Sequence, residues 1–466
     1  MISHDGNVVE RTGHVRPRQS FVPSTLIYKV EPLINIRKTL FVSLLFALLL
    51  LPVGGQPADA EDLAVVSVER NPEFAAALRQ LELDLLFEWE DRIYVLVRPQ
   101  DLMSLDRSAI PYLFETHRFP ALSHPQLSFL SSINGDYHSY KELEADLLSL
   151  QAAYPDLARV FTIGTSLEER NVYGLKISDN VSQDEQEPEV LFLGCHHARE
   201  WISVEVPYLL GKHLLESYDT DVEVRRLVNQ SEIWIVPLVN PDGLEYTIHY
   251  YRYWRKNRRL NADGTYGVDL NRNYGYLWGF DNEGSSPEPA STVYRGPEAF
   301  SEPETRAVRD LFLQNNFQAM ITYHSYSQVI LYPWGYTTGP SDKDSLLRQI
   351  AGQMSALMEP VNGRFYEFGQ AGAALYLTNG DTTDWTFGIA GIPSYTIELP
   401  PIDELQGGFF NTEQDIQTIF RENLPAALYV IDWSIQNFGF SDSAAKRDLF
   451  RSRLKKPLTK PRFQSN

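Results

Sequence analysis

The stretch EVLFLGCHHAREW, residues 189–201, is the part of the chain that best indicates its fold. It begins with a run of apolar residues, as expected for a strand that is buried on both faces of a sheet. Two adjacent histidines, an arginine and a glutamate follow, and such side chains are costly to bury without a partner or a metal. Ligand sites in open α/β sheets lie beyond the carboxyl ends of the strands. The sequence therefore predicts a functional site at this strand end.

Other segments alternate between strand-like and helix-like patterns. Helical spacing of apolar residues is found at 140–155, 201–218 and 412–436. Short apolar runs indicate further strands at 158–164, 172–178, 232–240, 318–324, 328–334 and 393–398. This alternation predicts an α/β domain with a mixed, largely buried central sheet flanked by helices.

The chain divides into four regions by composition. Residues 1–60 are an N-terminal extension, and residues 61–130 alternate short strands and helices, as in a small α+β domain with a connector. Residues 131–440 contain the α/β pattern. Residues 441–466 are a basic tail, for which we expect a solvated segment; its basic residues are Lys446, Arg447, Arg451, Arg453, Lys455, Lys456, Lys460 and Arg462.

The N-terminal extension has the features of a secretory signal. Arg37 and Lys38 precede an apolar segment at about 39–53, and the small residues ADA follow at 58–60. The apolar segment is shorter than the roughly 18 residues that a membrane-spanning helix needs. We expect a secreted or extracytoplasmic protein that has no stable membrane span after removal of the signal.

Composition and charge exclude several classes of protein. The chain has 466 residues, of which 43% are hydrophobic, so a large core is available. Its formal net charge of −20 disfavours a nucleic-acid partner, because such binding depends on clustered Lys and Arg. The single cysteine, Cys195, excludes an internal disulfide.

His197 and Glu200 are spaced as a pair of metal ligands would be. They lie three residues apart where the predicted strand meets a helix, so both side chains can approach one point. Catalytic zinc takes three protein ligands and leaves a position for water. His324, at the end of the predicted strand QAMITYH, can supply the third ligand. These residues predict a His2Glu zinc site with one zinc ion, whereas no HExxH sequence occurs.

Five separated motifs resemble those of one family, the secreted zinc metallocarboxypeptidases of the carboxypeptidase A/B family, closest in pattern to the bacterial carboxypeptidase T type. The likeness spans about residues 135–437. It rests on HAREW, YWRKNRR, GVDLNRNY, YHSYSQVILYPWG and YTIEL, which occur in the family's order. One departure is the pair of prolines in ELPPIDELQGG, which follows the fifth motif.

The resemblance implies a role for residues of each motif. Glu398 matches the general base that takes a proton from the zinc-activated water. Arg255 matches the arginine that stabilises the negative charge of the tetrahedral intermediate. Asp269 matches a carboxylate that supports a zinc-bound histidine. The residues implied to contact the substrate, by its terminal carboxylate or in a subsite, are Arg199, Asn271, Arg272 and Tyr376.

The resemblance also places the pocket for the substrate's C-terminal side chain. Its floor matches Thr383, a neutral residue, and Asp381 lies where a carboxylate could approach a cationic side chain. We expect broad specificity, with apolar and aromatic residues removed first, Lys and Arg more slowly, and Asp and Glu poorly.

The implied activity is zinc-dependent hydrolysis of the C-terminal peptide bond of peptides and proteins, by a monomer. One alternative is a zinc amidase of the same fold that acts on cell-wall peptides. Another is a binding protein without catalysis, which intact Glu398 and Arg255 oppose. The small domain resembles the family's propeptides in its placement, so an activating protease is a possible partner, with a cut within 116–140.

Overall fold

A computed structural model describes residues 64–114, 134–438 and 462–463, except for 72–73, 75–76, 79–80, 82, 90–91, 98, 109 and 404–405. The predicted signal segment at 39–53, the greater part of the connector at 116–140 and most of the basic tail lie outside these residues. Among the described residues, the structure contains no helix that is both long and apolar enough to cross a membrane.

The small N-terminal unit is an antiparallel sheet with a helix. Its elements are β1 (Ala64–Glu69), β2 (Asp84–Trp89), β3 (Arg92–Val97), α3 (Pro99–Arg107) and β4 (Tyr112–Phe114), with the strand order β2-β3-β1-β4. Alternate residues of β1 and β3, such as Val66, Val68, Ile93 and Val95, are buried in one core with Leu105 of α3. The unit is α+β, as its strand and helix patterns predict.

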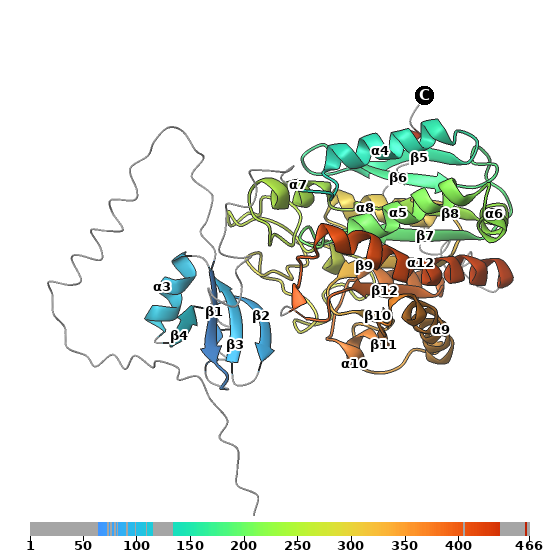
Figure 1. Cartoon of the computed structure of the whole chain (residues 1–466). Helices are drawn as coiled ribbons and strands as arrows, with labels where there is room; N and C mark the ends of the chain where they lie inside the picture. The colour runs from blue at the N-terminus through green and yellow to red at the C-terminus, as the bar shows by residue number, and fades with distance from the viewer. Residues whose placement is uncertain are drawn as a thin grey trace, which may run out of the picture. The chain divides into compact units, whose positions relative to one another are not determined.

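The larger unit is built on a nine-stranded sheet (Figure 1). Its strand order is β11-β10-β12-β9-β7-β8-β6-β5-β13. The strands are β5 (Ala158–Thr165), β6 (Asn171–Ile177), β7 (Glu189–Gly194), β8 (Glu232–Val236), β9 (Phe317–Ser325), β10 (Val329–Tyr332), β11 (Glu367–Gln370), β12 (Ser394–Leu399) and β13 (Arg462–Phe463). The central strands β8, β7, β9 and β12 are parallel, and antiparallel strands join on both sides.

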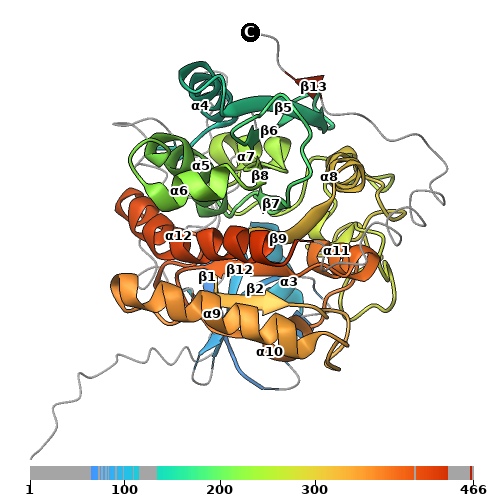
Figure 2. The same cartoon turned by 90° about the vertical axis from the view of Figure 1, so that its right-hand side faces the viewer.

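Helices cover both faces of this sheet. One core lies against α4 (Tyr140–Ala153), α5 (Ile202–Ser217), α6 (Val222–Val228), α9 (Asp344–Asn362) and α12 (Glu413–Gln436), and the other against α8 (Pro303–Gln314) and α11 (Thr382–Ala390). Figure 2 shows α12 and α9 lying side by side along one face. Because both faces are covered, every residue of β7, β8, β9 and β12 is buried. The predicted mixed and largely buried sheet is therefore confirmed.

The topology brings three strand ends together at one edge of the sheet. The parallel pair β7 and β9 aligns Gly194 with Tyr323, so the metal-ligand stretch that follows β7 lies beside His324. The parallel pair β9 and β12 sets His324 directly opposite Glu398. Residues more than 120 positions apart in the sequence thus meet, as parallel strands require.

The C-terminal tail differs from the expected solvated segment at the two residues that the structure describes. Arg462 and Phe463 form β13, which pairs antiparallel with Thr162 and Phe161 of the edge strand β5. Pairing of this kind covers backbone groups that an edge strand otherwise leaves open.

Candidate active site

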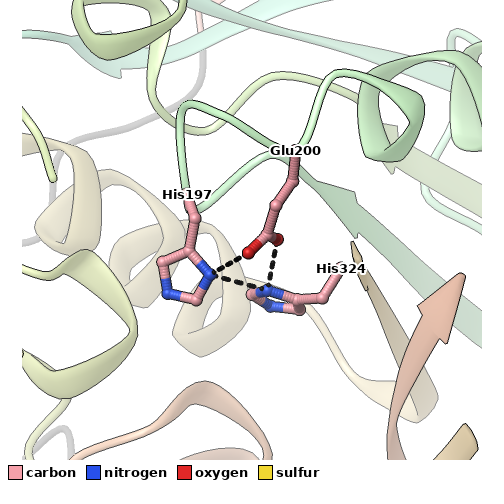
Figure 3. A group of neighbouring side chains, drawn as sticks. All are labelled: His197, Glu200 and His324. Carbon is pink, nitrogen blue, oxygen red and sulfur yellow. Dashed lines mark hydrogen bonds and ion pairs between the residues drawn. The ribbon is translucent and has the colours of Figure 1, made fainter. Parts of the chain in front are cut away.

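The predicted ligands converge in the structure (Figure 3). The Nδ1 atom of His197 lies 2.8 Å from Oε1 of Glu200, and Nδ1 of His324 lies 3.0 Å from Oε2 of the same carboxylate. The two Nδ1 atoms are 3.1 Å apart. All three residues are buried, and their possible ligand atoms lie within 4.8 Å of one another. Two imidazoles and a carboxylate are a donor set that suits Zn²⁺.

The loop that carries His197 and Glu200 is held by close backbone packing. Gly194 ends β7, and a Cβ there would lie 2.1 Å from the carbonyl oxygen of Ser203 in α5, so a larger residue does not fit. The amide of Ala198 donates to the carbonyl of Arg255 over 3.0 Å. Asn240 Nδ2 donates to the carbonyls of His196 and Lys256, both at 3.1 Å. The loop is therefore fixed against the segment that carries Arg255.

Asp269 joins the metal ligands to Arg255. Its Oδ1 lies 3.1 Å from Nε2 of His197, and its Oδ2 accepts from Nε and Nη2 of Arg255 at 3.0 and 2.9 Å. The remaining nitrogen of that guanidinium, Nη1, lies 3.9 Å from Oε1 of Glu200. Burial opposes ionisation of Asp269, but Arg255 and the other cations hold the pKa of its carboxyl well below the usual range.

This arrangement fixes the tautomer of His197. An ionised Asp269 accepts a hydrogen bond from Nε2–H, which leaves the lone pair of Nδ1 directed at Glu200 and His324. The predicted supporting position of Asp269 therefore fits the geometry. It also shows why Arg255, among the basic residues of its segment, is directed at the metal ligands.

His196 does not take part in the ligand group. Its Nε2 lies 2.8 Å from the hydroxyl of Tyr274 and 3.1 Å from Oγ1 of Thr382. Its ring stacks on the ring of His324 with 5.5 Å between centroids. Burial and the neighbouring histidines hold the pKa of His196 well below its usual value, so it stays neutral and supports His324.

Glu398 ends β12 beside His324 and is 8% exposed. Burial, with the charge of Glu200, raises the pKa of its carboxyl well above the usual value, although Arg255 and Arg272 oppose this rise. A carboxyl with a raised pKa can hold and release a proton near neutral pH.

A cleft beside this group is lined by three of the residues predicted to contact substrate and by Arg255, whereas Asn271, Asp381 and Thr383 are not among its lining residues. Arg199, Arg255, Arg272 and Tyr376 all line it. Arg272 is 2% exposed, and within the described residues its buried Nε has no hydrogen-bond partner. Its guanidinium lies 5.9 Å from the centre of the Tyr376 ring, which is half exposed.

Asn271 and Thr382 are coupled behind Arg272. The side-chain oxygen of Asn271 accepts from the amide and the hydroxyl of Thr382 at 2.9 and 2.8 Å. This orients the amide so that its NH2 group is the part that Asn271 can offer to a ligand.

Asp381 and Thr383 are both buried, and the structure uses Asp381 within its own loop. Its Oδ1 accepts from the amide of Asp384 and the hydroxyl of Thr383, both at 2.8 Å, and so caps α11. Its Oδ2 accepts from the hydroxyl of Thr378 at 2.6 Å. These bonds favour a supporting role for Asp381 over the predicted contact with cationic side chains.

Sequence reasoning did not single out Thr382 or Tyr274, which hold Asn271 and His196. Their hydroxyls carry no pattern of their own, although Tyr274 ends the motif GVDLNRNY and Thr382 lies between Asp381 and Thr383. Two acidic groups away from the site also meet the spacing of a cation site: Asp179, Glu185 and Glu187, and Asp184, Glu189 and Glu232.

Comparisons with known proteins agree with this geometry. The model of the family described as zinc carboxypeptidase matches residues 143–426. Carboxypeptidase B of Astacus astacus is 37% identical over 269 residues, which cover 56% of this chain and 86% of that protein. A zinc carboxypeptidase of Saccharothrix mutabilis subsp. capreolus is 34% identical over 311 residues, covering 64% of this chain and 69% of that protein.

Two solved structures share the fold. That of thrombin activatable fibrinolysis inhibitor aligns with a TM-score of 0.69 and 26% identity, covering 81% of this chain and all of the other. That of carboxypeptidase A from Helicoverpa armigera aligns with a TM-score of 0.64 and 26% identity, covering 82% and 99%. The chain belongs to the zinc carboxypeptidase family. It is a zinc-dependent hydrolase, and its substrates are the C-termini of peptides.

Proposed function

We propose that this protein is a secreted, monomeric exopeptidase that removes single residues from peptide and protein C-termini, with His197, Glu200 and His324 as zinc ligands. The observation that carries this proposal is the buried Nε of Arg272 in the cleft beside the ligand group. A buried guanidinium donor without a partner favours a planar anion, and a terminal carboxylate is such an anion. Asn271 adds a second donor beside it.

The other residues of the cleft would act on the peptide bond. A bound zinc ion would lower the pKa of a water molecule and polarise the carbonyl group. Glu398 would accept a proton and pass it to the leaving amine, since it lies opposite His324 in the sheet. Arg255 would stabilise the negative charge on the former carbonyl oxygen, because Asp269 holds its side chain and leaves Nη1 directed at the ligand group.

The specificity pocket would be neutral. Thr383 carries no charge, and Asp381 is held in its loop by hydrogen bonds. The apolar area that the substrate's C-terminal side chain buries would therefore decide which residues are removed. We expect Leu, Phe and Tyr to be removed fastest, Lys and Arg more slowly, and Asp and Glu poorly. Tyr376, half exposed above Arg272, would cover the bound carboxylate.

A matched pair of peptides tests this proposal. One ends in a free carboxylate and the other, of the same sequence, in an amide; mass spectrometry follows the loss of C-terminal residues with zinc and with a chelator. We expect loss from the free peptide alone and only with zinc. The Arg272→Gln variant should raise KM by about tenfold or more, whereas Arg258→Gln, outside the cleft lining, should not.

Equal hydrolysis of the two peptides would show that the enzyme does not require a free terminal carboxylate. An amidase acting on cell-wall peptides would then become the better account.

A further inference from the structure

Glu283 is an acidic residue in a cleft whose other charged lining residues are arginines. The catalytic domain contributes to this lining Arg199, Arg255, Arg272, Glu283, Gly284, Thr292, Val293, Tyr376 and Leu377. Glu283 is exposed. Within the part of the chain that the structure describes, no hydrogen bond or ion pair engages its carboxylate. No motif in the sequence drew attention to it.

The loop that carries Glu283 is held in one place by its own side chains. Oδ1 of Asp281 accepts from the amides of Glu283 and Gly284, both at 3.0 Å. Arg295 Nη1 donates to the carbonyl of Asp281 and to Oδ1 of Asn282, also both at 3.0 Å. These hydrogen bonds hold the backbone at Glu283 in position, although the side chain of Glu283 is exposed.

This loop is also fastened to the segment that follows Tyr376. Asn379 Nδ2 donates to Oδ1 of Asp281 over 2.7 Å, and the amide of Asn379 donates to the carbonyl of Gly284 over 3.3 Å. A Cβ at Gly284 would lie 2.6 Å from Nδ2 of Asn379, so the two segments are in close contact. Glu283 is thus attached to the wall of the cleft that carries Tyr376.

The other charged groups near Glu283 have partners of their own, which leaves the carboxylate of Glu283 available to a substrate. Asp269 already neutralises Arg255, and a substrate carboxylate would neutralise Arg272. Asp381, which the sequence predicts to contact cationic side chains, instead accepts a hydrogen bond from the amide of Asp384 as the N-cap of α11. Glu283 is the carboxylate of the lining that remains for a substrate side chain.

We propose that Glu283 is a specificity-determining residue, which attracts Lys or Arg and repels Asp or Glu at the last two positions of a substrate. This inference rests on the proposed function and adds a substrate preference to it. The effect is modest, because exposed charge pairs are screened by water and salt: a preference of about two- to fivefold is expected, and it should weaken at high salt.

Two series of peptides test the inference with the protein in its zinc-bound, activated form. Lys, Gln or Glu occupies the C-terminal position in one series and the preceding position in the other. The variants are Glu283→Gln and, as a matched control, Glu288→Gln, an exposed glutamate of the same loop outside the cleft lining. The readout is the ratio of kcat/KM for Lys to that for Glu.

We expect Glu283→Gln to reduce this ratio by about two- to fivefold in at least one series, while the Gln peptides and the Glu288→Gln variant stay unchanged. A ratio unaltered in both series, or altered equally by Glu288→Gln, would overturn the inference. Failure of the proposed function looks different, because the wild-type protein would then trim none of the peptides.

Discussion

Arg255 shows how one residue at the site depends on another. Asp269 binds two of its nitrogens, which leaves the third near Glu200. We predict that Arg255→Ala lowers kcat by about 10²- to 10³-fold, as removal of an oxyanion donor does, and leaves bound zinc unchanged. Steady-state kinetics and metal analysis check this. A rise in KM alone, with kcat unaltered, would assign Arg255 to substrate binding.

Asp381 either supports its own loop or contacts the cationic side chain of a substrate, and a substitution distinguishes these two roles. Its three hydrogen bonds cap α11 and fix Thr378 and Thr383. We expect Asp381→Asn to cost about 0.5–2 kcal/mol of stability and to change kcat/KM for C-terminal Arg and Leu peptides by the same factor. A several-fold loss confined to Arg peptides would instead support the contact predicted from the sequence.

Residues of the site differ in how far the sequence could predict them. The ligands were predictable because His197 and Glu200 lie at a strand end and His324 at another. The hydrogen bonds of Asp381 were not, since a helix cap is recognised only when the first residue of the helix is known. Glu283 lies in a loop without periodicity, and nothing but its position in the cleft distinguishes it from Glu288.

His138 ties the start of the catalytic domain to helices α5 and α4. Its amide and Nδ1 lie 2.9 and 2.7 Å from the oxygens of Glu205, and its Nε2 lies 3.2 Å from Asp146. Burial opposes protonation, but the hydrogen bonds and charges of these carboxylates raise the pKa of His138 to about 9. A raised pKa contributes stability below the unfolded value of about 6.5, and this is lost as the pH rises through 9.

We therefore predict that His138→Gln lowers the free energy of unfolding by about 1–3 kcal/mol at pH 6 and by much less at pH 10. Denaturant unfolding at the two pH values measures the difference. His249→Gln is the control, because His249 is exposed and its contact with Glu245 is longer, at 3.4 Å. An equal loss at both pH values would mean that packing, rather than charge, holds His138.

The strands of the central sheet were predictable where they are long and apolar. Strands β5 to β8, β9, β10 and β12 lie where apolar runs indicate them. The edge strands β11 and β13 were not predicted, because β11 (EFGQ) starts with an exposed glutamate and β13 consists of two residues.

We predict that the small N-terminal domain acts as an inhibitory propeptide of the catalytic domain. The structure ties the segment from Asn134 to Ser139 to the catalytic domain: Tyr137 donates to the carbonyl of Asn411 over 3.1 Å, and Asn134 contacts Glu142. Backbone held in this way resists proteolysis, so we expect the activating cut before Asn134. Mass spectrometry of the secreted protein locates the cut, and full activity of the uncut chain would contradict inhibition.

We propose that His197, Glu200 and His324 hold zinc and that Glu398 acts on the substrate without binding the metal. The most direct test measures zinc content and peptide trimming together for the wild type, His324→Ala and Glu398→Gln. We predict about one zinc per wild-type chain, loss of both zinc and activity in His324→Ala, and retained zinc with activity lowered by several orders of magnitude in Glu398→Gln. Full zinc content in His324→Ala, or near-normal trimming by Glu398→Gln, would contradict this account.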